Sequence, residues 1–434
     1  MATVAHCLQQ VKSHLGELVS PQDIFQICRQ LGHQWRQRLL DPAVTVQLFL
    51  LQLLAGVALE GLRHVAQIPA SAQAICKAKA RLPLKLWMEL VRRSAVGSSA
   101  AAALWHGLTV CLVDGTSLMT PDTPAWAGHF GKAKNQRGTS RGYPMPKLLA
   151  LLDLTGGWIA QVIALPCDRQ EYTCLSRLFA AAAKMGARSL LLGDRGLVSF
   201  THLALLMAAG LQACFRLPRG QVVRGRRHGT RRRLKRLGKQ DLLVCWSAAR
   251  RPRWMSQKRW EKLGLAQRQL TLRQISFRVC RTGFRTHWAW IVTTLLDPQE
   301  YPAQDLIELY SQRWQVEVYF RDLKQTLGMK QLAARTITGV RKEILAFVLL
   351  YNLVRRLMQQ AAAQQNTTPD RISFIDALRA LLWSSPGQPL PRLKINPLRL
   401  RPSPPRRLKN ARHRFPQLKG TRQALTKPPY RVLL

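Results

Sequence analysis

Residues 310–329 read YSQRWQVEVYFRDLKQTLGM, and this stretch contains four polar or charged side chains, spaced three, four and seven residues apart: Tyr310, Arg313, Glu317 and Lys324. At roughly 100° per helical residue, this spacing predicts that all four lie within an arc of about 60° on one helix. Apolar residues fall directly beside that arc. We expect a helix that buries one stripe and presents one acid, two cations and a phenol at its border.

Two interpretations fit such a helix. A carboxylate held on a rigid helix can ligate a divalent metal, while Arg and Lys one or two turns away can hold phosphates. An ordinary amphipathic helix, in which Glu317 pairs with its neighbours on a solvated face, has the same pattern. The helix alone does not separate the two, so the choice depends on carboxylates elsewhere in the chain.

Two aspartates follow predicted buried strands upstream of that helix. Residues 108–113, LTVCLV, form a continuous apolar run that leads into Asp114 and Gly115, and residues 189–192 lead into the GDRG sequence that contains Asp194. In α/β sheets, functional groups collect at the carboxyl ends of strands. Either aspartate alone fits a turn residue or a helix cap. Both together, in a chain that also has Glu317, favour a shared site.

Three carboxylates at one sheet edge repel one another unless cations bind between them. Two Mg²⁺ or Mn²⁺ ions about 3.5–4 Å apart would relieve the repulsion and promote in-line displacement at a phosphodiester. No cysteine nucleophile motif, P-loop or G-x-S-x-G sequence competes for the catalytic role. The residue types therefore predict metal-dependent phosphoryl transfer on nucleic acid, with two ions in each active site.

The order of predicted elements is typical of a ribonuclease-H-like α/β fold. A three-stranded meander (108–113, 147–154 and 158–165) is followed by a helix (171–185), a strand (189–192), a helix (200–209) and a strand (211–217). Residues 128–147 are glycine-rich and basic, which predicts a loop. We expect this core in two parts, 105–217 and 288–360, the second containing the 310–329 helix. A β-rich basic insertion, 218–287, interrupts it.

The N-terminal part, residues 1–104, has helical periodicity throughout. Helices are expected at 8–18, 21–40, 44–66 and 83–97. Pro21 opens the second of them, with Ser20 as a fitting N-cap. The apolar run of the third is interrupted by glutamines and a glutamate, so we expect a buried helix and no membrane partner. Residues 71–81, SAQAICKAKAR, fit either a DNA-backbone contact or an exposed helical face.

The charge balance is strongly basic. Lys and Arg outnumber Asp and Glu by 67 to 22, a formal net charge of +45 over 434 residues. So many like charges repel one another, so a polyanionic partner such as nucleic acid explains the imbalance better than solubility alone. The nine cysteines are scattered without a C-x-x-C pair, and the first residues lack a signal-peptide layout. We therefore expect a cytoplasmic protein.

Two segments concentrate the positive charge. Residues 216–259 contain sixteen Lys and Arg against one acid, Asp241, and residues 391–434 contain thirteen Lys and Arg with several prolines. The second segment predicts an extended arm within a basic C-terminal region, 361–434. The arm would lie along nucleic acid or a partner subunit; the alternative is a solvated tail. Tryptophans interleave with the charge around the first, which suits either base stacking or the core of a small β-rich insert. They are Trp246, Trp254, Trp260, Trp288 and Trp290.

The sequence resembles a known group of enzymes. The pattern Tyr310-x2-Arg313-x3-Glu317-x6-Lys324 matches the YREK signature of the DDE transposases encoded by bacterial insertion sequences, the IS4-like group. Asp114 in LVDGT matches the first acidic motif of the group, and GDRG matches the second. The group also has a β-strand insertion before its glutamate, and here 123 residues (317−194) separate the two acids. The resemblance spans nearly the whole chain.

The resemblance implies a role for each matched position. Asp114 would bridge two metal ions, and Asp194 and Glu317 would each complete one of them. Arg313 and Lys324 would hold the phosphates of the transposon end, and Tyr310 would support that contact. The resemblance further implies double-stranded DNA partners (terminal inverted repeats and target), a synaptic homodimer, cleavage through a hairpin, and an insertion tryptophan that stacks a flipped base.

We therefore expect a cut-and-paste DNA transposase that acts in the bacterial cytoplasm, at the nucleoid. Two alternatives are open. A ribonuclease-H-like nuclease would cleave without joining, although the long basic insertion and arm disfavour it. A non-catalytic, basic nucleic-acid-binding protein would fit the composition equally well, so only the carboxylate set separates it from a transposase. Which tryptophan stacks a base, and whether a hairpin forms, is not determined by the sequence.

Overall fold

The computed structural model describes residues 19–95, 104–134, 140–248, 250–280, 286–383, 391–397 and 431–433. The expected helix at 8–18 and most of the expected arm lie outside these residues. The chain divides into two compact units. Unit 1 comprises Met1–Ala103, Asp114–Glu171 and Gln315–Asn396, and unit 2 comprises Leu104–Val113, Tyr172–Trp314 and Pro397–Leu434.

The described N-terminal part of unit 1 is helical, as predicted. Its elements are α2 (Pro21–Gln30), α3 (Pro42–Ala55), α4 (Leu59–Val65), α5 (Ala72–Arg81) and α6 (Leu84–Ser94). Ser20 caps α2 as expected, since its hydroxyl accepts a hydrogen bond from the Asp23 N–H at 3.0 Å. In the described part of the chain, no single helix is long and apolar enough to cross a membrane, although the pair α3 and α4, bent by 103°, meets those criteria jointly.

Two of the predicted N-terminal helices are shorter than expected. The helix expected at 21–40 ends at Gln30, and the helix expected at 44–66 is broken into α3 and α4. In both cases a glycine with positive φ follows the break, Gly32 at 65° and Gly56 at 63°. Glycine adopts this left-handed conformation without a Cβ penalty and thereby ends a helix. The apolar periodicity of the sequence continues through such a break, so a prediction from periodicity alone does not detect it.

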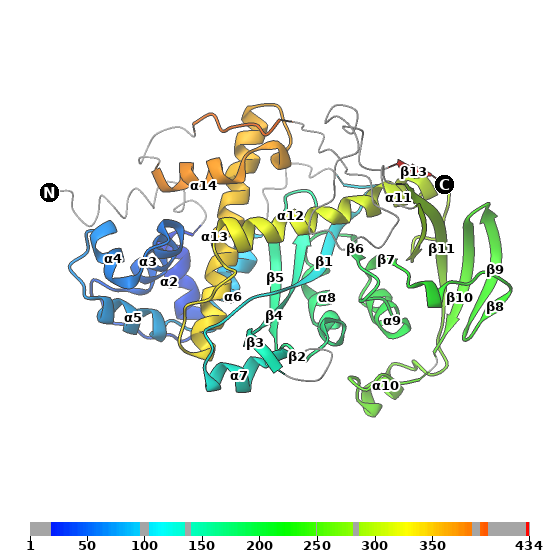
Figure 1. Ribbon diagram of the computed structural model, residues 1–434, viewed down its shortest axis with the longest axis horizontal. Helices are drawn as coiled ribbons and strands as arrows, with labels where there is room; N and C mark the ends of the chain where they lie inside the picture. The colour runs from blue at the N-terminus through cyan, green and yellow to red at the C-terminus, as the bar shows by residue number, and fades with distance from the viewer. Residues whose placement is uncertain are drawn as a thin grey trace, which may run out of the picture. The chain divides into compact units, whose positions relative to one another are not determined.

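The core of unit 1 forms around the long helix α13 (Ile337–Gln364), which packs against α6 and against α14 (Phe374–Trp383) (Figure 1). Asn352 of α13 is fully buried and bonds both backbone groups of Ile159, accepting at 2.8 Å and donating at 2.9 Å. Its amide also donates to the Ser94 hydroxyl of α6 at 2.9 Å. One polar side chain therefore joins α13 to two other elements.

Unit 1 also contains the predicted hairpin of β4 (Lys147–Asp153) and β5 (Ile159–Leu165), which pair antiparallel. In the strand order, β4 lies next to β1 (Thr109–Ser117), and just past that strand the Leu118 N–H donates to the Pro146 carbonyl at 2.9 Å. The prediction of a loop at 128–147 was wrong in part. This segment contains the end of α7 (Pro124–Phe130) and the short paired strands β2 (Lys132–Lys134) and β3 (Ser140–Pro144).

Unit 2 is a mixed sheet with the strand order β1-β6-β7-β12-β11-β10-β9-β8. The strands β6 (Ser189–Gly193) and β7 (Gln212–Arg216) are parallel to one another and joined by α9 (Phe200–Ala208), and β6 is also parallel to β1. The helix expected at 171–185 is instead a 3₁₀ segment, η1 (Glu171–Leu178), followed by one turn, α8 (Phe179–Ala182). The expectation of an α/β protein with N-terminal helices is confirmed.

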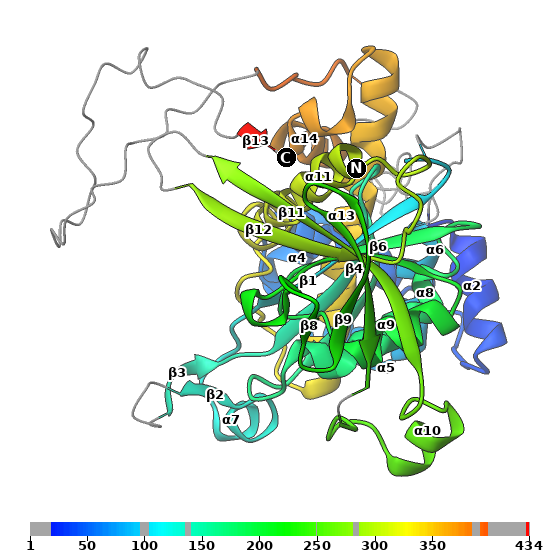
Figure 2. The ribbon, with the colours of Figure 1, turned by 90° about the vertical axis from the view of Figure 1, so that its right-hand side faces the viewer.

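The segment expected to be a β-rich insertion, 218–287, contains strands that pair antiparallel, called the insertion strands below (Figure 2). They are β8 (Arg227–His228), β9 (Arg231–Gly238), β10 (Asp241–Ser247) and β11 (Gln269–Cys280), with β12 (His287–Thr293) next to β11. A short helix, α10 (Gln257–Lys262), lies between β10 and β11. Because β12 also pairs with β7, the insertion strands extend the sheet of unit 2. The short strand β13 (Arg431–Leu433) pairs with β11.

A buried ion pair lies within the insertion strands. Arg273 of β11 is 0% exposed and donates to both carboxylate oxygens of Asp241, from Nε at 2.9 Å and from Nη2 at 2.5 Å. Its remaining nitrogen, Nη1, donates to the Tyr301 carbonyl at 2.6 Å. Asp241, the lone acid in the basic segment 216–259, therefore neutralises a buried arginine.

Candidate active site

Asp114 lies inside a strand and not, as expected, at the end of one. β1 extends to Ser117, so three residues beyond Asp114 are still extended. Gly115 has no positive φ, which means that it does not turn the backbone here. The Gly115 N–H donates to Asp114 Oδ1 at 2.8 Å, and this bond holds the carboxylate against its own strand. The apolar run before Asp114 is buried as predicted.

The stretch 310–329 is not one regular helix, which corrects the predicted 60° arc. α11 (Ala303–Ser311) is followed by a 3₁₀ turn, η3 (Gln312–Trp314), then by α12 (Gln315–Arg321) and a π-helical turn, η4 (Asp322–Thr326). Residues advance by about 120° in a 3₁₀ turn and by less than 100° in a π turn, so the predicted alignment does not apply. The apolar side chains beside the signature are nevertheless buried, among them Val316 and Leu323.

Within unit 1, Lys324 contacts the strand of Asp114. Lys324 Nζ donates to the Thr116 hydroxyl at 3.0 Å, and Thr116 is two residues beyond Asp114 in β1. Side chains two residues apart in a strand face the same side of the sheet. Burial lowers the pKa of Lys324, and the charge of Lys330 lowers it further. Glu317 belongs to the same unit, where it lies exposed in the first turn of α12.

Within unit 2, Asp194 directly follows β6, as predicted, and Tyr310 lies beside it. The Tyr310 hydroxyl donates to the Gly193 carbonyl at 3.4 Å, and its side chain is buried. Burial raises the pKa of Tyr310; the charge of Arg313 opposes that shift and the charge of Asp194 adds to it. The structure therefore brings Tyr310, Arg313 and Asp194 together in one unit, with Tyr310 bonded to the backbone that carries the acid.

The predicted site residues thus form two groups. Asp114, Glu317 and Lys324 belong to unit 1, and Asp194, Tyr310 and Arg313 belong to unit 2. Within either unit, the described residues include no cluster of three or more His, Cys, Asp or Glu side chains that could hold a metal ion.

One acid near Asp114 was not found from the sequence. Glu171, the first residue of η1, is half-buried, and its carboxylate lies against Gly115. Burial raises the pKa of Glu171; the charge of Lys147 opposes the shift and the negative charge of Asp114 adds to it. No motif marks Glu171, because its position depends on how η1 packs against β1. The one signal in the sequence was the glycine beside Asp114, whose missing side chain leaves space for that carboxylate.

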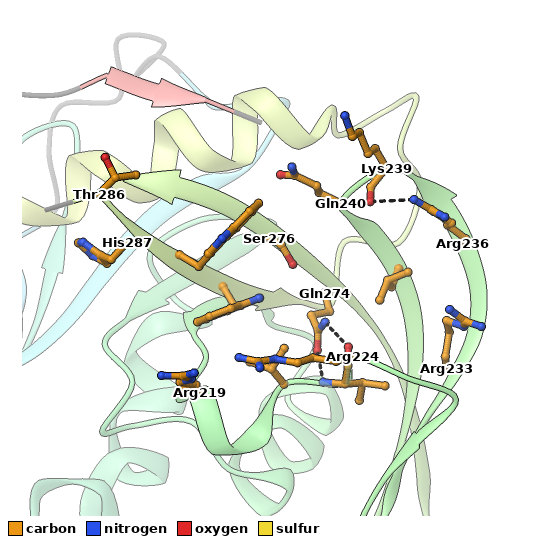
Figure 3. Close-up of a pocket in the computed structure, with 15 residues that line it drawn as sticks. Arg219, Arg224, Arg233, Arg236, Lys239, Gln240, Gln274, Ser276, Thr286 and His287 are labelled. Carbon is orange, nitrogen blue, oxygen red and sulfur yellow. Dashed lines mark hydrogen bonds between the residues drawn. The ribbon is translucent and has the colours of Figure 1, made fainter. Parts of the chain in front are cut away.

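The insertion strands form a basic groove of about 790 Å³ in unit 2 (Figure 3). Arg233 and Arg236 extend from β9, while Arg219 and Arg224 come from the segment before β8 (Figure 3). Trp288 and Trp290 of β12 also line the groove. None of its described lining residues is acidic.

The structure distinguishes the five tryptophans that the sequence left undecided, and one of them, Trp254, stacks on His202 with ring centres 4.7 Å apart. Trp246 and Trp260 are buried and belong to the core of the unit. Trp290 is half-buried, with the Arg224 guanidinium 5.5 Å from its ring centre. Trp288 is 44% exposed, with the Arg278 guanidinium 5.9 Å from its ring. Of the two tryptophans that line the groove, Trp288 offers the more open aromatic surface.

The chain belongs to the family described as Transposase DDE domain, which matches residues 105–353. Transposase InsG for insertion sequence element IS4, from Escherichia coli (strain K12), is 27% identical over 323 residues, 70% of this chain and 67% of that protein. A probable transposase for insertion sequence element IS5377, from Geobacillus stearothermophilus, is 37% identical over 73 residues, 17% of this chain and 19% of its own. Among solved structures, a piggyBac transposase synaptic complex with hairpin DNA covers 88% of this chain and 80% of its own, with 9% identity and a TM-score of 0.44.

Proposed function

We propose that the protein is the DNA transposase of an insertion sequence, of the YREK group, and that it acts as a homodimer on paired terminal inverted repeats by cut-and-paste. The observation that carries this proposal is the family match over residues 105–353, a range that contains Asp114, Asp194, Glu317, Arg313 and Lys324. The succession of β1, β4 and β5, then β6, α9 and β7, supports a ribonuclease-H-like core.

The residues of the proposed site fit Mg²⁺ or Mn²⁺, the ions that the family implies. Carboxylate oxygens are the ligands that such hard cations prefer. In unit 1, Asp114 is close enough to Glu171 for its charge to raise the pKa of that acid, and a divalent cation relieves this kind of repulsion. Asp114, Asp194 and Glu317 would hold the ions, which when bound activate a water or 3′-hydroxyl for attack on a phosphodiester.

The other residues of the site act by position and charge. Lys324 is held by Thr116 on the strand of Asp114, so its ammonium would contact a phosphate next to that acid. Arg313, whose charge acts on Tyr310, would hold a second phosphate near Asp194. Tyr310 would fix the backbone before Asp194 through the Gly193 carbonyl, because its hydroxyl is directed into the protein. We therefore assign Tyr310 a positioning role rather than a direct contact with DNA.

The basic groove would hold the backbone of the transposon end, and Trp288 would stack one of its bases. Several arginines line the groove, and an exposed ring among them suits the face of an unpaired base. Arg278 lies close to the Trp288 ring and would stabilise the stacked pair by cation–π attraction.

A Trp288→Ala variant is expected to bind DNA with an unpaired base at the transposon end about tenfold more weakly, because stacking on an aromatic side chain contributes about 1–3 kcal/mol. Fluorescence anisotropy with labelled terminal-repeat DNA measures the change. Leu234→Ala is the matched control, since Leu234 is 45% exposed on β9 and is not among the groove residues. Equal affinities of the two variants would remove Trp288 from the DNA contact.

The proposed function is tested on a plasmid that carries a marker between the inverted repeats flanking the gene. In Mg²⁺, the purified protein is expected to release the marker and join it to a second plasmid, and EDTA is expected to stop both steps. Cleavage without joining would indicate a nuclease. Binding without cleavage in Mg²⁺ or Mn²⁺ would indicate a nucleic-acid-binding protein without catalytic activity.

A further inference from the structure

Glu171 is a half-buried acid within unit 1. It begins η1, directly after the turn that follows β5. Lys147 Nζ donates to the Arg169 carbonyl at 3.3 Å, which ties this turn to the first residue of β4. The backbone that presents Glu171 is therefore anchored to the hairpin that lies beside β1 in the strand order.

The contact between Glu171 and β1 depends on a glycine. A Cβ added to Gly115 would overlap all three atoms of the Glu171 carboxyl group, so any other residue at position 115 would displace it. Gly115 lies within β1 and has no positive φ, so its conformation does not require glycine. The lack of a side chain is what the position needs, because it lets a carboxylate reach the backbone next to Asp114.

Glu171 and Asp114 carry like charges, and the negative charge of Asp114 adds to the rise that burial causes in the pKa of Glu171. Two acids are close enough to interact, and one of them is half-buried. The charge of Lys147 compensates in part. A carboxylate held against the residue that follows a second carboxylate contributes little to packing, whereas both would be stabilised by a shared divalent ion.

We propose that Glu171 is a fourth carboxylate of the metal site, supplied next to Asp114 from within the same unit through the space left by Gly115. The inference rests on the proposed function, and it adds a residue outside the Asp114, Asp194 and Glu317 set. Glu171 would bind the ion directly or through a water molecule, and would thereby raise the affinity of unit 1 for the metal.

The test measures metal binding without DNA, by titrating full-length protein with Mn²⁺ in a calorimeter. Glu171→Gln keeps the size of the side chain and removes its charge, so we expect Mn²⁺ binding to weaken by about 10–100-fold. Glu171→Asp should restore part of the loss. Glu308→Gln is the matched control, because Glu308 is an exposed acid on α11 that accepts a hydrogen bond from Gln304.

A second measurement separates a ligand from a purely structural acid. Fe²⁺ with ascorbate and peroxide cuts the backbone near a bound ion, and cuts are expected near residues 114–116 and 170–172 in the parent protein, with both lost in Glu171→Gln. Unchanged Mn²⁺ affinity and cutting in Glu171→Gln, with both lost in Asp114→Asn, would overturn the role of Glu171 alone. If Asp114→Asn also bound Mn²⁺ and processed DNA normally, the assignment of Asp114 to the metal site, on which this inference rests, would fail.

Discussion

An Asp114→Asn variant is expected to lose DNA strand cleavage and joining by a factor of about 10³ or more, equivalent to about 4 kcal/mol of transition-state stabilisation. Asparagine has the shape of aspartate and can still accept the hydrogen bond from the Gly115 N–H, so the strand should stay intact. The charge that would hold the divalent ions is lost. Affinity for terminal-repeat DNA, measured in parallel by anisotropy, is expected to stay within about twofold of that of the parent protein. Contacts between Lys and Arg side chains and the DNA phosphates dominate this affinity.

Asp168→Asn is the control for that experiment, since Asp168 is an exposed acid in the same unit. Its cleavage rate should match that of the parent protein. Normal joining of DNA in Mg²⁺ by the Asp114 variant would show that the catalytic acids have been assigned wrongly. A loss of DNA affinity as large as the loss of cleavage would instead point to misfolding.

An Asp241→Asn variant is expected to lower the free energy of unfolding by about 3–5 kcal/mol. Arg273 is fully buried, and the substitution removes the one charge that its Nε and Nη2 contact. An uncompensated buried guanidinium costs far more than the lost pair is worth, because it cannot regain its hydration. Denaturant unfolding followed by tryptophan fluorescence measures the change.

A surface ion pair provides the comparison. Asp122 pairs with Lys132 at 2.6 Å, and its side chain is 48% exposed. Asp122→Asn is therefore expected to cost at most about 1 kcal/mol. A double variant, Asp241→Leu with Arg273→Met, should recover most of the stability lost by Asp241→Asn, because it removes both buried charges. If Asp241→Asn were as stable as the parent protein, Asp241 would not be what stabilises Arg273.

The parts of the fold predicted correctly are those that local patterns specify. The apolar runs that became β6 and the β4–β5 hairpin are bounded by glycine and turn residues, and Ser20 with Pro21 marked the start of α2. The errors arose where geometry departs from an ideal period. The stretch 310–329 combines 3₁₀, α and π turns, and a calculation at a constant 100° per residue cannot represent that change.

The candidate site shows the same limit at the level of single residues. Asp194 was predicted at a strand end because the apolar run stops there, whereas β1 continues through Asp114 in a polar sequence that carries no strand signal. Glu171 and Trp288 could not be selected from the sequence. The position of the first depends on tertiary packing against Gly115, and the exposure of the second depends on which face of β12 forms the groove.

The bonds of Asn352 constrain how this protein can diverge. Ser94 and Ile159, which it joins to α13, come from the N-terminal helices and from the β4–β5 hairpin. An insertion sequence whose transposase acquired the N-terminal helices of a distant relative would place foreign side chains against α13. The buried amide of Asn352 would then lack its hydrogen bond to Ser94. A new DNA specificity gained by such an exchange would therefore require compensating changes in α13. We expect the N-terminal helices and α13 to be inherited together.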